Sequence, residues 1–378
     1  LYRADLRTGL REDFTYDERN RLRSAARTLN GNAIGTQNFV YDQWGSFVSK
    51  GDLTYTNGSY SGMSQSCGRQ STSPHMVTRV VGTSGTTVYC YDANGNQVSA
   101  GDGNPNSTAP GQRLIQYAVH DKPLSVTTTG AGGAVTRYQY GPGREIVKRI
   151  DGPTATAIDR ETDYVGGVEI SYLPNQGTTT DRREYKRHLA NYLVITLKSE
   201  RQNGTLVRSS TRHYRFEEKL GSLDVLTDRN AVVIQRFSFD VWGERRNESN
   251  WAAYTQTEIA AFNSQNTRKG YTGHEHIDQA NLIHMGGRVY DPRIARFLSA
   301  DPLVQAPNLS QSFNRYSYVM NNPMNYVDPS GYSWLSDNWR TIASIAITVF
   351  APYAWGATSF AQLSLTQAVI TGMVSGAV

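Results

Sequence analysis

The sequence is poor in charge and in cysteine. Only 19% of its 378 residues are Asp, Glu, Lys or Arg, and the net charge of +5 is spread without long basic runs. Nucleic-acid-binding domains normally gather basic residues on one face, so this pattern predicts no nucleic-acid partner. The two cysteines, Cys67 and Cys90, flank a polar loop and either form one disulfide or remain two free thiols.

The sequence also lacks the motifs of the common enzyme classes. It has no G-x-S-x-G elbow, no Walker A loop and no G-x-G-x-x-G fingerprint, and its seven histidines are scattered. His274, Glu275 and His276, with His284 beyond them, could suggest a metal site, but their spacing is not that of the helical zinc-binding motifs. We therefore predict packing and turn roles for them, with no metal and no cofactor.

A secretory signal is missing as well. The first residues, LYRADLRTGLRED, are charged and do not begin with Met. We expect the chain to be a piece of a longer protein, incomplete at both ends.

Tyrosine and glycine, in contrast, are abundant. The 23 Tyr residues outnumber Phe and Trp together, and 34 Gly residues can supply tight turns, a composition typical of strands and turns. Four stretches share one plan, in which an apolar strand ending in Tyr, usually before Asp, leads through a polar turn into a second strand. They are DFTYDERNRLRSA from Asp13, NFVYDQWGSFVSK from Asn38, TVYCYDANGNQVSA from Thr87 and LIQYAVHDKPLSV from Leu114.

Each of these stretches is typical of one β-hairpin. We expect the tyrosines to point the same way and the aspartates to open the turns by accepting backbone N–H bonds; these are Tyr16, Tyr41 and Tyr91, and Asp17, Asp42 and Asp92. Because a lone hairpin is only marginally stable in water, the units must stack edge to edge into a continuous sheet. The predicted fold class is all-β, and the alternative is an ordinary β-sandwich with coincidental Tyr-Asp pairs.

These units resemble the YD repeats of Rhs proteins, of the shell-forming components of insecticidal ABC toxin complexes and of teneurins. The second half of the chain is more specific, and three stretches resemble successive parts of the Rhs-associated core domain. They are HYRFEEKLGSLDVLTDRNAVVIQRFSFDVWGERR (213–246), YTGHEHIDQANLIHMGGRVYDPRIARFLSADPLV (271–304) and QSFNRYSYVMNNPMNYVDPSGY (311–332).

The resemblance implies an architecture. In this family the YD strands wind as a spiralling sheet into a hollow shell, the core domain plugs one end, and a variable toxin segment follows the core. We accordingly expect a shell segment at 1–210, a core plug at 211–332 and the start of a toxin region at 333–378, with a short helical tail.

The resemblance also implies self-cleavage by an aspartyl-type site. Carried over by position, the catalytic pair is Asp301 and Asp328, and the scissile bond joins Tyr332 to Ser333. Two close carboxylates cannot both ionise cheaply, so one can take a proton from water while the other, protonated, polarises the carbonyl or protonates the leaving amine. An arginine could hold one carboxylate ionised, and Arg288 is favoured over the second candidate, Arg296.

The chain departs from the family motif in two places. Val304 stands where the family has Gly, with a longer spacer to Asp328, and Tyr332 stands where cleaved members have Leu. The alternative role for both aspartates is structural, because Asp-Pro pairs also cap turns, and a third pair occurs at Asp291.

The tail differs in character from the rest of the chain. Residues 341–378 are uncharged and mostly apolar, but Pro352 and Gly356 interrupt them. Three readings are open: a membrane-inserting helical hairpin, a small-residue helical segment enclosed in the shell, or the opening of a longer toxin domain. The last two together are favoured, with the toxin's own catalytic centre beyond this chain.

The sequence is therefore interpreted as the shell and plug of an Rhs-type secreted toxin, made in the bacterial cytoplasm and delivered into target cells. Its expected partners are its own C-terminal segment as cargo, the N-terminal remainder of the shell, a type VI or ABC-toxin delivery system and an immunity protein. The alternatives are a surface adhesion or carbohydrate-binding module using Trp44 and Trp242, and a membrane-inserting effector acting through residues 341–378.

Overall fold

The structure is a computed structural model that describes residues 1–64, 67, 73–130, 132–189, 192–260, 262 and 264–332. Within these residues the chain forms 24 strands and a few short helical turns, so the predicted all-β class is confirmed. The expected helical tail, and with it Ser333, lies outside the described residues. No helix in the described part is long and apolar enough to cross a membrane.

The first 20 strands form one continuous antiparallel sheet, in which each strand pairs with the strands before and after it in the chain. This meander replaces the two packed sheets of the sandwich alternative. The strands are β1 (Tyr2–Asp5), β2 (Leu10–Tyr16), β3 (Leu22–Leu29), β4 (Asn32–Tyr41), β5 (Phe47–Lys50), β6 (Leu53–Asn57), β7 (Val77–Gly82), β8 (Gly85–Tyr91), β9 (Gln97–Gly101), β10 (Arg113–Tyr117), β11 (Pro123–Thr128), β12 (Val135–Tyr140), β13 (Ile146–Gly152), β14 (Arg160–Val165), β15 (Val168–Leu173), β16 (Thr179–Leu189), β17 (Leu193–Gln202), β18 (Thr205–Glu217), β19 (Leu223–Thr227) and β20 (Val233–Arg236).

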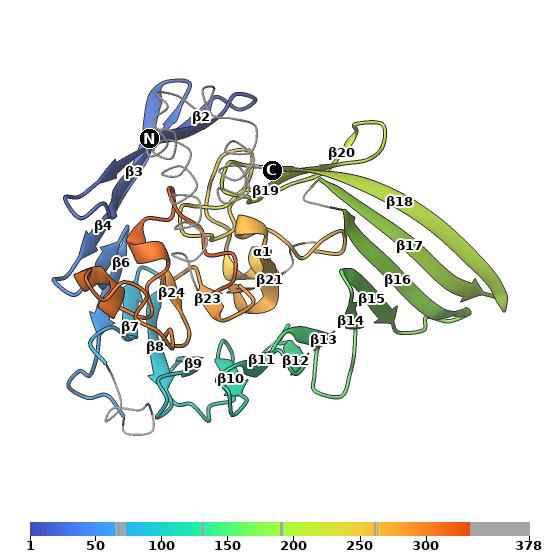
Figure 1. Cartoon of the computed structure of the whole chain (residues 1–378), viewed down its shortest axis with the longest axis horizontal. Helices are drawn as coiled ribbons and strands as arrows, with labels where there is room; N and C mark the ends of the chain where they lie inside the picture. Colours follow the sequence, from blue (N-terminus) through green and yellow to red (C-terminus); the bar gives the residue numbers. More distant parts are fainter. Residues whose placement is uncertain are drawn as a thin grey trace, which may run out of the picture.

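The sheet curves into an arc around the segment that follows it. Figure 1 shows it running from β2–β4 at the upper left, through β6–β13, to β16–β18 at the right and β19–β20 at the top. A small antiparallel sheet lies inside the arc, and its strands are β21 (Glu275–Ile277), β22 (Leu282–His284), β23 (Val289–Asp291) and β24 (Arg296–Phe297). The same inner segment contains short helices before, between and after these strands. They are α1 (Gln256–Ala260), η2 (Tyr271–Gly273), η3 (Asp278–Ala280), η4 (Ser310–Phe313) and η5 (Val319–Asn321).

The four repeated stretches each form one hairpin, β2–β3, β4–β5, β8–β9 and β10–β11. In the three turns that begin with aspartate, its Oδ1 atom accepts the backbone N–H groups two and four residues later, at 2.8–3.0 Å from Asp17, Asp42 and Asp92. The third residue after each aspartate has a positive φ, as a type I turn followed by a bulge requires. The predicted turn role of these aspartates is confirmed.

The tyrosines of the repeats connect neighbouring strands. A hydroxyl at the end of one strand donates to the backbone carbonyl at the start of the strand before it, at 2.8–3.0 Å. The pairs are Tyr41 with Leu22, Tyr91 with Val77, Tyr117 with Gln97, and Tyr140 with Pro123. The hydroxyl thus satisfies its own polar group while its ring is buried, and the bond adds to the ladder that joins the two strands.

The main core lies between the inner face of the sheet and the enclosed segment. Tyr16, Tyr41 and Tyr91 pack on one cluster of buried side chains, so they point the same way, as predicted. Trp242 sits at the centre of this cluster with no exposed surface, and its ring lies 5.7 Å from Phe39. It therefore cannot stack on a sugar, and the carbohydrate-binding alternative was wrong for this residue.

The two cysteines form a disulfide. Their Cα atoms lie 4.3 Å apart, and the bridge fastens the loop after β6 to the end of β8. Of the two possibilities that the sequence left open, the structure has the bridged one.

Candidate functional site

The two Asp-Pro motifs meet inside the arc, next to a buried arginine. Asp301 follows β24, Asp328 lies in the loop after η5, and Arg288 stands directly before β23. Their exposed fractions are only 4%, 2% and 4%, respectively. The fold therefore brings together the two aspartates that the resemblance suggested and the arginine that was favoured beside them.

Arg288 is the centre of this group. Its Nη2 atom lies 3.2 Å from Oδ2 of Asp301 and 3.6 Å from Oδ2 of Asp328. Its Nε atom donates to the carbonyl oxygen of Gly331 at 2.6 Å, and Nη1 donates to that of Arg315 at 3.0 Å. Burial lowers the pKa of Arg288, and the two carboxylates oppose this shift. Because an arginine side chain stays protonated in proteins, its charged guanidinium contacts both carboxylates through the same Nη2 atom.

Both carboxylates also cap their own turns. Oδ1 of Asp301 accepts the N–H of Leu303 at 2.9 Å, and Oδ1 of Asp328 accepts that of Gly331 at 2.8 Å. Oδ2 of Asp301 accepts the side-chain amide of Gln305 at 2.6 Å. The structural role that the sequence offered as an alternative is thus present in the hydrogen bonds, together with the contacts to Arg288.

A small cavity lies against these side chains. It is lined by Arg288, Asp301, Gln305 and Asp328, with neighbouring loop residues, and encloses about 20 Å³. That volume is enough for one water molecule, and the polar lining supplies hydrogen-bond partners for it. A hydrolytic water could therefore be held beside the two carboxylates.

The chain just before the expected scissile bond is fixed to the turn between β22 and β23. The N–H of Gly287 donates to the carbonyl oxygen of Ser330 at 2.7 Å. Gly331 has φ +72°, and a Cβ atom there would lie 2.4 Å from the carbonyl oxygen of Met285. Only glycine fits this conformation and this approach.

Tyr332 packs where the family motif has Leu. A Cβ atom on Gly287 would lie 2.4 Å from its ring, so the absence of a side chain at Gly287 makes room for the larger residue. The carbonyl oxygen of Tyr332 accepts a hydrogen bond from the Gln305 side chain. The nitrogen of the scissile bond belongs to Ser333, outside the described residues.

Arg296, the second candidate arginine, serves another purpose. It is 1% exposed, and its two Nη atoms donate at 2.9 Å to Oδ1 of Asn321 and to the carbonyl oxygen of Gly45. It therefore fastens the enclosed segment to the turn between β4 and β5, while Arg288 is the arginine beside the aspartates.

The two histidines of the GHEH stretch and His284 each make a hydrogen bond to a different backbone group. His274 donates from Nε2 to the carbonyl oxygen of Asp328 at 2.9 Å, and burial lowers its pKa to about 4. His276 accepts the N–H of Tyr271 at 3.0 Å, while His284 accepts that of Gly286 at 3.1 Å. Over the described residues, no three side chains of the metal-ligating types converge.

Sequence reasoning missed two residues of this site. Gln305 stands four positions after Asp301 in the stretch DPLVQ, and nothing local indicates that its amide reaches Tyr332. His274 lies 54 positions before Asp328, so only the folded chain brings them into contact.

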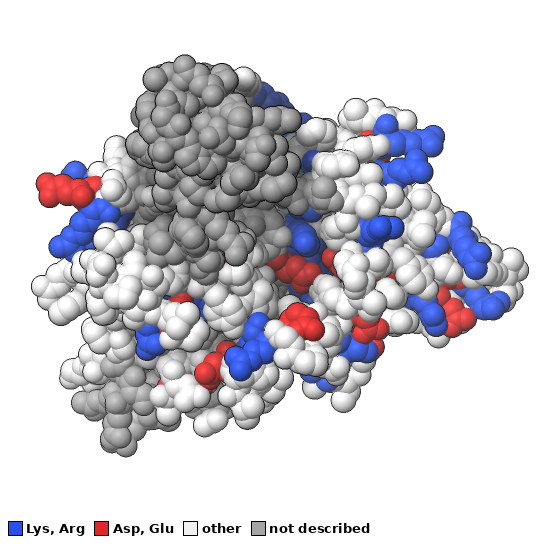
Figure 2. All heavy atoms as spheres, in the orientation of Figure 1, with Lys and Arg blue, Asp and Glu red and all other residues white. Residues whose placement is uncertain are grey.

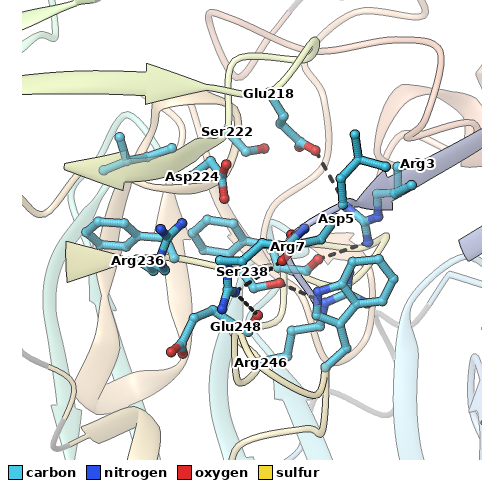
Figure 3. Close-up of a pocket in the computed structure, with 16 residues that line it drawn as sticks. Arg3, Asp5, Arg7, Glu218, Ser222, Asp224, Arg236, Ser238, Arg246 and Glu248 are labelled. Carbon is cyan, nitrogen blue, oxygen red and sulfur yellow. Dashed lines mark hydrogen bonds and ion pairs between the residues drawn. The ribbon is translucent and has the colours of Figure 1, made fainter. Parts of the chain in front are cut away.

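A larger cavity of about 420 Å³ lies where the two ends of the sheet approach each other, between β1 and the β19–β20 region. Figure 3 shows Arg3 and Glu218 pointing toward each other there, with Nη1 of Arg3 3.7 Å from Oε2 of Glu218. Arg3 also donates to the carbonyl oxygen of Phe239 at 2.9 Å, and buried Glu12 pairs with both Arg3 and Arg246. These charged side chains already have partners, so we assign them to holding β1 and β2 against the β19–β20 end of the sheet. We call this contact between the two ends of the sheet the seam.

Charge on the visible surface is mixed. Figure 2 shows described basic and acidic side chains interspersed over the face it presents. Some of these side chains form ion pairs between neighbouring strands. Examples are Arg201 with Asp181 and Lys198 with Glu184, which join β17 to β16.

Comparison with known proteins gives matches of low identity to several large toxins. The chain is 24% identical over 239 residues to the tRNA3(Ser)-specific nuclease WapA of Bacillus spizizenii, which covers 63% of this chain and 9% of that protein. It is 25% identical over 235 residues to toxin subunit YenC1 of Yersinia entomophaga, covering 61% and 23%. It is 26% identical over 261 residues to double-stranded DNA deaminase toxin A of Burkholderia cenocepacia, covering 64% and 16%.

The chain thus spans less than a quarter of the length of these relatives. Among solved structures it is similar to TcdB2-TccC3, with a TM-score of 0.44 and 18% identity, over 85% of this chain and 19% of that one. For TcdB2-TccC3 without its hypervariable C-terminal region, the TM-score is 0.47 and the identity 19%, over 85% and 17%. No model of a known protein family matches. Over about three fifths of its length, the chain is thus similar to the nuclease WapA and to toxin subunit YenC1.

Proposed function

We propose that this chain is a part of the shell and plug of an Rhs-type toxin, and that the plug cuts the chain between Tyr332 and Ser333. One observation carries the self-cleavage proposal. Asp301 and Asp328 both lie within 3.6 Å of one Nη atom of Arg288, and the Nε atom of the same side chain holds the carbonyl oxygen of Gly331.

The chemistry is the hydrolysis of one peptide bond. A water oxygen forms a bond to the carbonyl carbon of Tyr332 while one carboxylate of the pair accepts the water's proton. The bond from that carbon to the nitrogen of Ser333 then breaks, and the nitrogen takes up a proton to leave as an amine. The products are a new carboxylate at Tyr332 and a new amino terminus at Ser333, with water as the only co-reactant.

The proposed biological role is to keep a toxic segment away from the producing cell until delivery. The curved sheet around an inner segment suits such a shell, and the rest of the shell would come from sequence outside this chain. In this proposal the shell spans 1–210, the plug 211–332 and the cargo begins at Ser333. The complete protein would be secreted or delivered into target cells, with a delivery system and an immunity protein as partners.

The intact mass of freshly purified protein tests the cleavage. The wild type should give two species whose masses sum to the full chain plus one water, divided after Tyr332. Asp301→Asn and Asp328→Asn should each give one uncut mass. Asp228→Asn is the matched control, because this aspartate also caps a turn through its carboxylate but lies between β19 and β20.

Samples should stay near neutral pH, because hot acid hydrolyses Asp-Pro bonds and would imitate cleavage. A single uncut mass for the wild type and all three variants would reject self-cleavage and leave both aspartates as turn caps.

A further inference from the structure

The side-chain amide of Gln305 lies at the proposed cleavage site, between Asp301 and Tyr332. We propose that the side chain of Gln305 is a further catalytic group, which donates a hydrogen bond to the carbonyl oxygen of Tyr332 and stabilises the negative charge that develops there. This inference rests on the proposed self-cleavage and goes further by naming the group that activates the scissile carbonyl.

The geometry supports this assignment. The Nε2 atom of Gln305 carries two hydrogens, and it contacts two acceptors: Oδ2 of Asp301 at 2.6 Å and the carbonyl oxygen of Tyr332. The contact to Asp301 sets the orientation of the amide, because a carboxylate oxygen attracts the NH₂ group and repels the amide oxygen. The NH₂ group is thereby directed at Tyr332.

The loop that carries Gln305 is fixed on both sides. On one side Asp301 caps the N–H of Leu303 at 2.9 Å, and on the other Ala306 donates from its backbone to the hydroxyl of Ser312 at 2.9 Å. A donor placed in advance by its surroundings needs no reorganisation when charge develops, which is the condition under which such hydrogen bonds speed acyl transfer most.

This assignment changes which group polarises the scissile carbonyl and which groups transfer protons. In an aspartyl-type mechanism, a protonated carboxylic acid polarises the carbonyl. Here a neutral amide does so: the electron pair of the C=O bond moves onto the Tyr332 oxygen and stays there, and the N–H group of Gln305 stabilises that negative charge through its hydrogen bond. The carboxylates then need only move protons: one accepts a proton from the attacking water and returns it to the nitrogen of Ser333.

The test is the rate of cleavage of the full chain, made by cell-free translation and followed by intact mass from the moment of synthesis. Gln305→Ala should slow cleavage about 100- to 1,000-fold, the usual effect of removing one such donor. Gln311→Ala is the control, because it removes a glutamine of the same segment whose amide donates to the carbonyl oxygen of Arg19, in the turn between β2 and β3. Cleavage in this control should keep the wild-type rate.

Gln305→Glu gives a readout that a purely structural role would not move. At neutral pH its carboxylate would repel both Asp301 and the Tyr332 oxygen, and cleavage should stop. As the pH falls through the range where that side chain takes up a proton, its O–H can donate in place of the amide. The ratio of the variant's rate to the wild-type rate should therefore rise as the pH is lowered from 7 to 5.

Each outcome decides the matter. If the wild type and Gln311→Ala cut, Asp301→Asn does not, and Gln305→Ala cuts at the wild-type rate, the role of Gln305 is overturned while self-cleavage stands. If Gln305→Ala is slow but Gln305→Glu stays at the same low fraction of the wild-type rate at every pH, Gln305 is a structural tether. If the wild type does not cut, both proposals fail together.

Discussion

The Nε atom of Arg288 donates a hydrogen bond of 2.6 Å to the carbonyl oxygen of Gly331. The same guanidinium contacts both aspartates, so one side chain sets the distance between the carboxylate pair and the peptide bond proposed to break. The planar guanidinium of Arg288 also stacks on the ring of Phe297, with the guanidinium carbon 3.6 Å from the ring centre. A planar, forked cation suits this combination of contacts, and a lysine ammonium does not.

Arg288→Lys should therefore stop cleavage although it keeps the positive charge. A single ammonium cannot contact both carboxylates and two carbonyl oxygens, so buried acceptors lose their partners at a cost of about 1–3 kcal/mol each. Intact mass reports the cleavage, and urea unfolding in an Asp301→Asn background reports the stability without interference from cutting. Arg201→Lys, an exposed pair with Asp181, is the control and should change neither quantity. Wild-type cleavage in Arg288→Lys would show that charge alone suffices.

The seam between the two ends of the sheet gives a second prediction. Glu12 is 3% exposed and lies 2.7 Å from Arg3 and 3.3 Å from Arg246. Burial would raise the pKa of Glu12, but the two guanidinium groups outweigh it and the pKa is lowered. Glu12→Gln leaves the buried Arg246 without its carboxylate and takes one of two carboxylate partners from Arg3, so we expect a loss of about 3–5 kcal/mol in the free energy of unfolding.

Hydrogen exchange should locate this effect, with faster exchange in β1 and in β19–β20 than in β10–β13. Asp13→Asn is the matched control, because the neighbouring carboxylate points outward and its pair with Arg11 is largely exposed. It should cost less than about 1 kcal/mol. Equal losses for the two variants would contradict a role of Glu12 in closing the seam.

The buried histidines predict a weakening of the fold in mild acid. Burial lowers the pKa of His274 to about 4 and that of His284 to about 3. An unfolded histidine titrates near 6.5, so between that pH and the folded pKa the unfolded chain binds the proton and the folded chain does not. The stabilisation is complete above pH 6.5 and is lost as the pH falls, by up to about 1.4 kcal/mol per pH unit for each histidine.

Urea unfolding of the Asp301→Asn chain between pH 7.5 and 5 should show this slope. Replacing His274 by Gln should reduce the loss over that range by about 2 kcal/mol, because one of the titrating groups is gone. An unchanged slope would mean that His274 is protonated in the folded protein despite its burial.

The parts of the fold that could be predicted from sequence are those set by near neighbours. The Asp42 turn is determined by residues within four positions of it, since the carboxylate, the two N–H groups and Gly45 all belong to one short stretch. The all-β class followed from repeating that local pattern. The contacts of Gln305 and His274, in contrast, depend on segments that only the folded chain brings together.

Two tryptophans show where local reasoning ends. Trp44 and Trp242 occupy the same position in two turns, and the N–H of each donates to the aspartate two residues before it at 2.8 Å. Yet Trp44 is 54% exposed and Trp242 is fully buried. The difference arises because the second turn lies in the enclosed segment and packs on β4 and β5. The turn sequence fixes the backbone, and the position in the arc decides which side chain is covered.

Gly331 provides the sharpest test of how the cleavage segment is held. Gly331→Ala places a methyl group 2.4 Å from the carbonyl oxygen of Met285, in a residue with φ +72°, so the segment must leave the turn before β23. Gly204→Ala is the matched control, because this residue has φ +78° and no atom within 4 Å of the added methyl group. Both should lose about 1–2 kcal/mol for the left-handed backbone, but only Gly331→Ala should stop cleavage, as measured by intact mass. If both variants cut at the wild-type rate, the position of Tyr332 seen here is not the one from which the bond is broken.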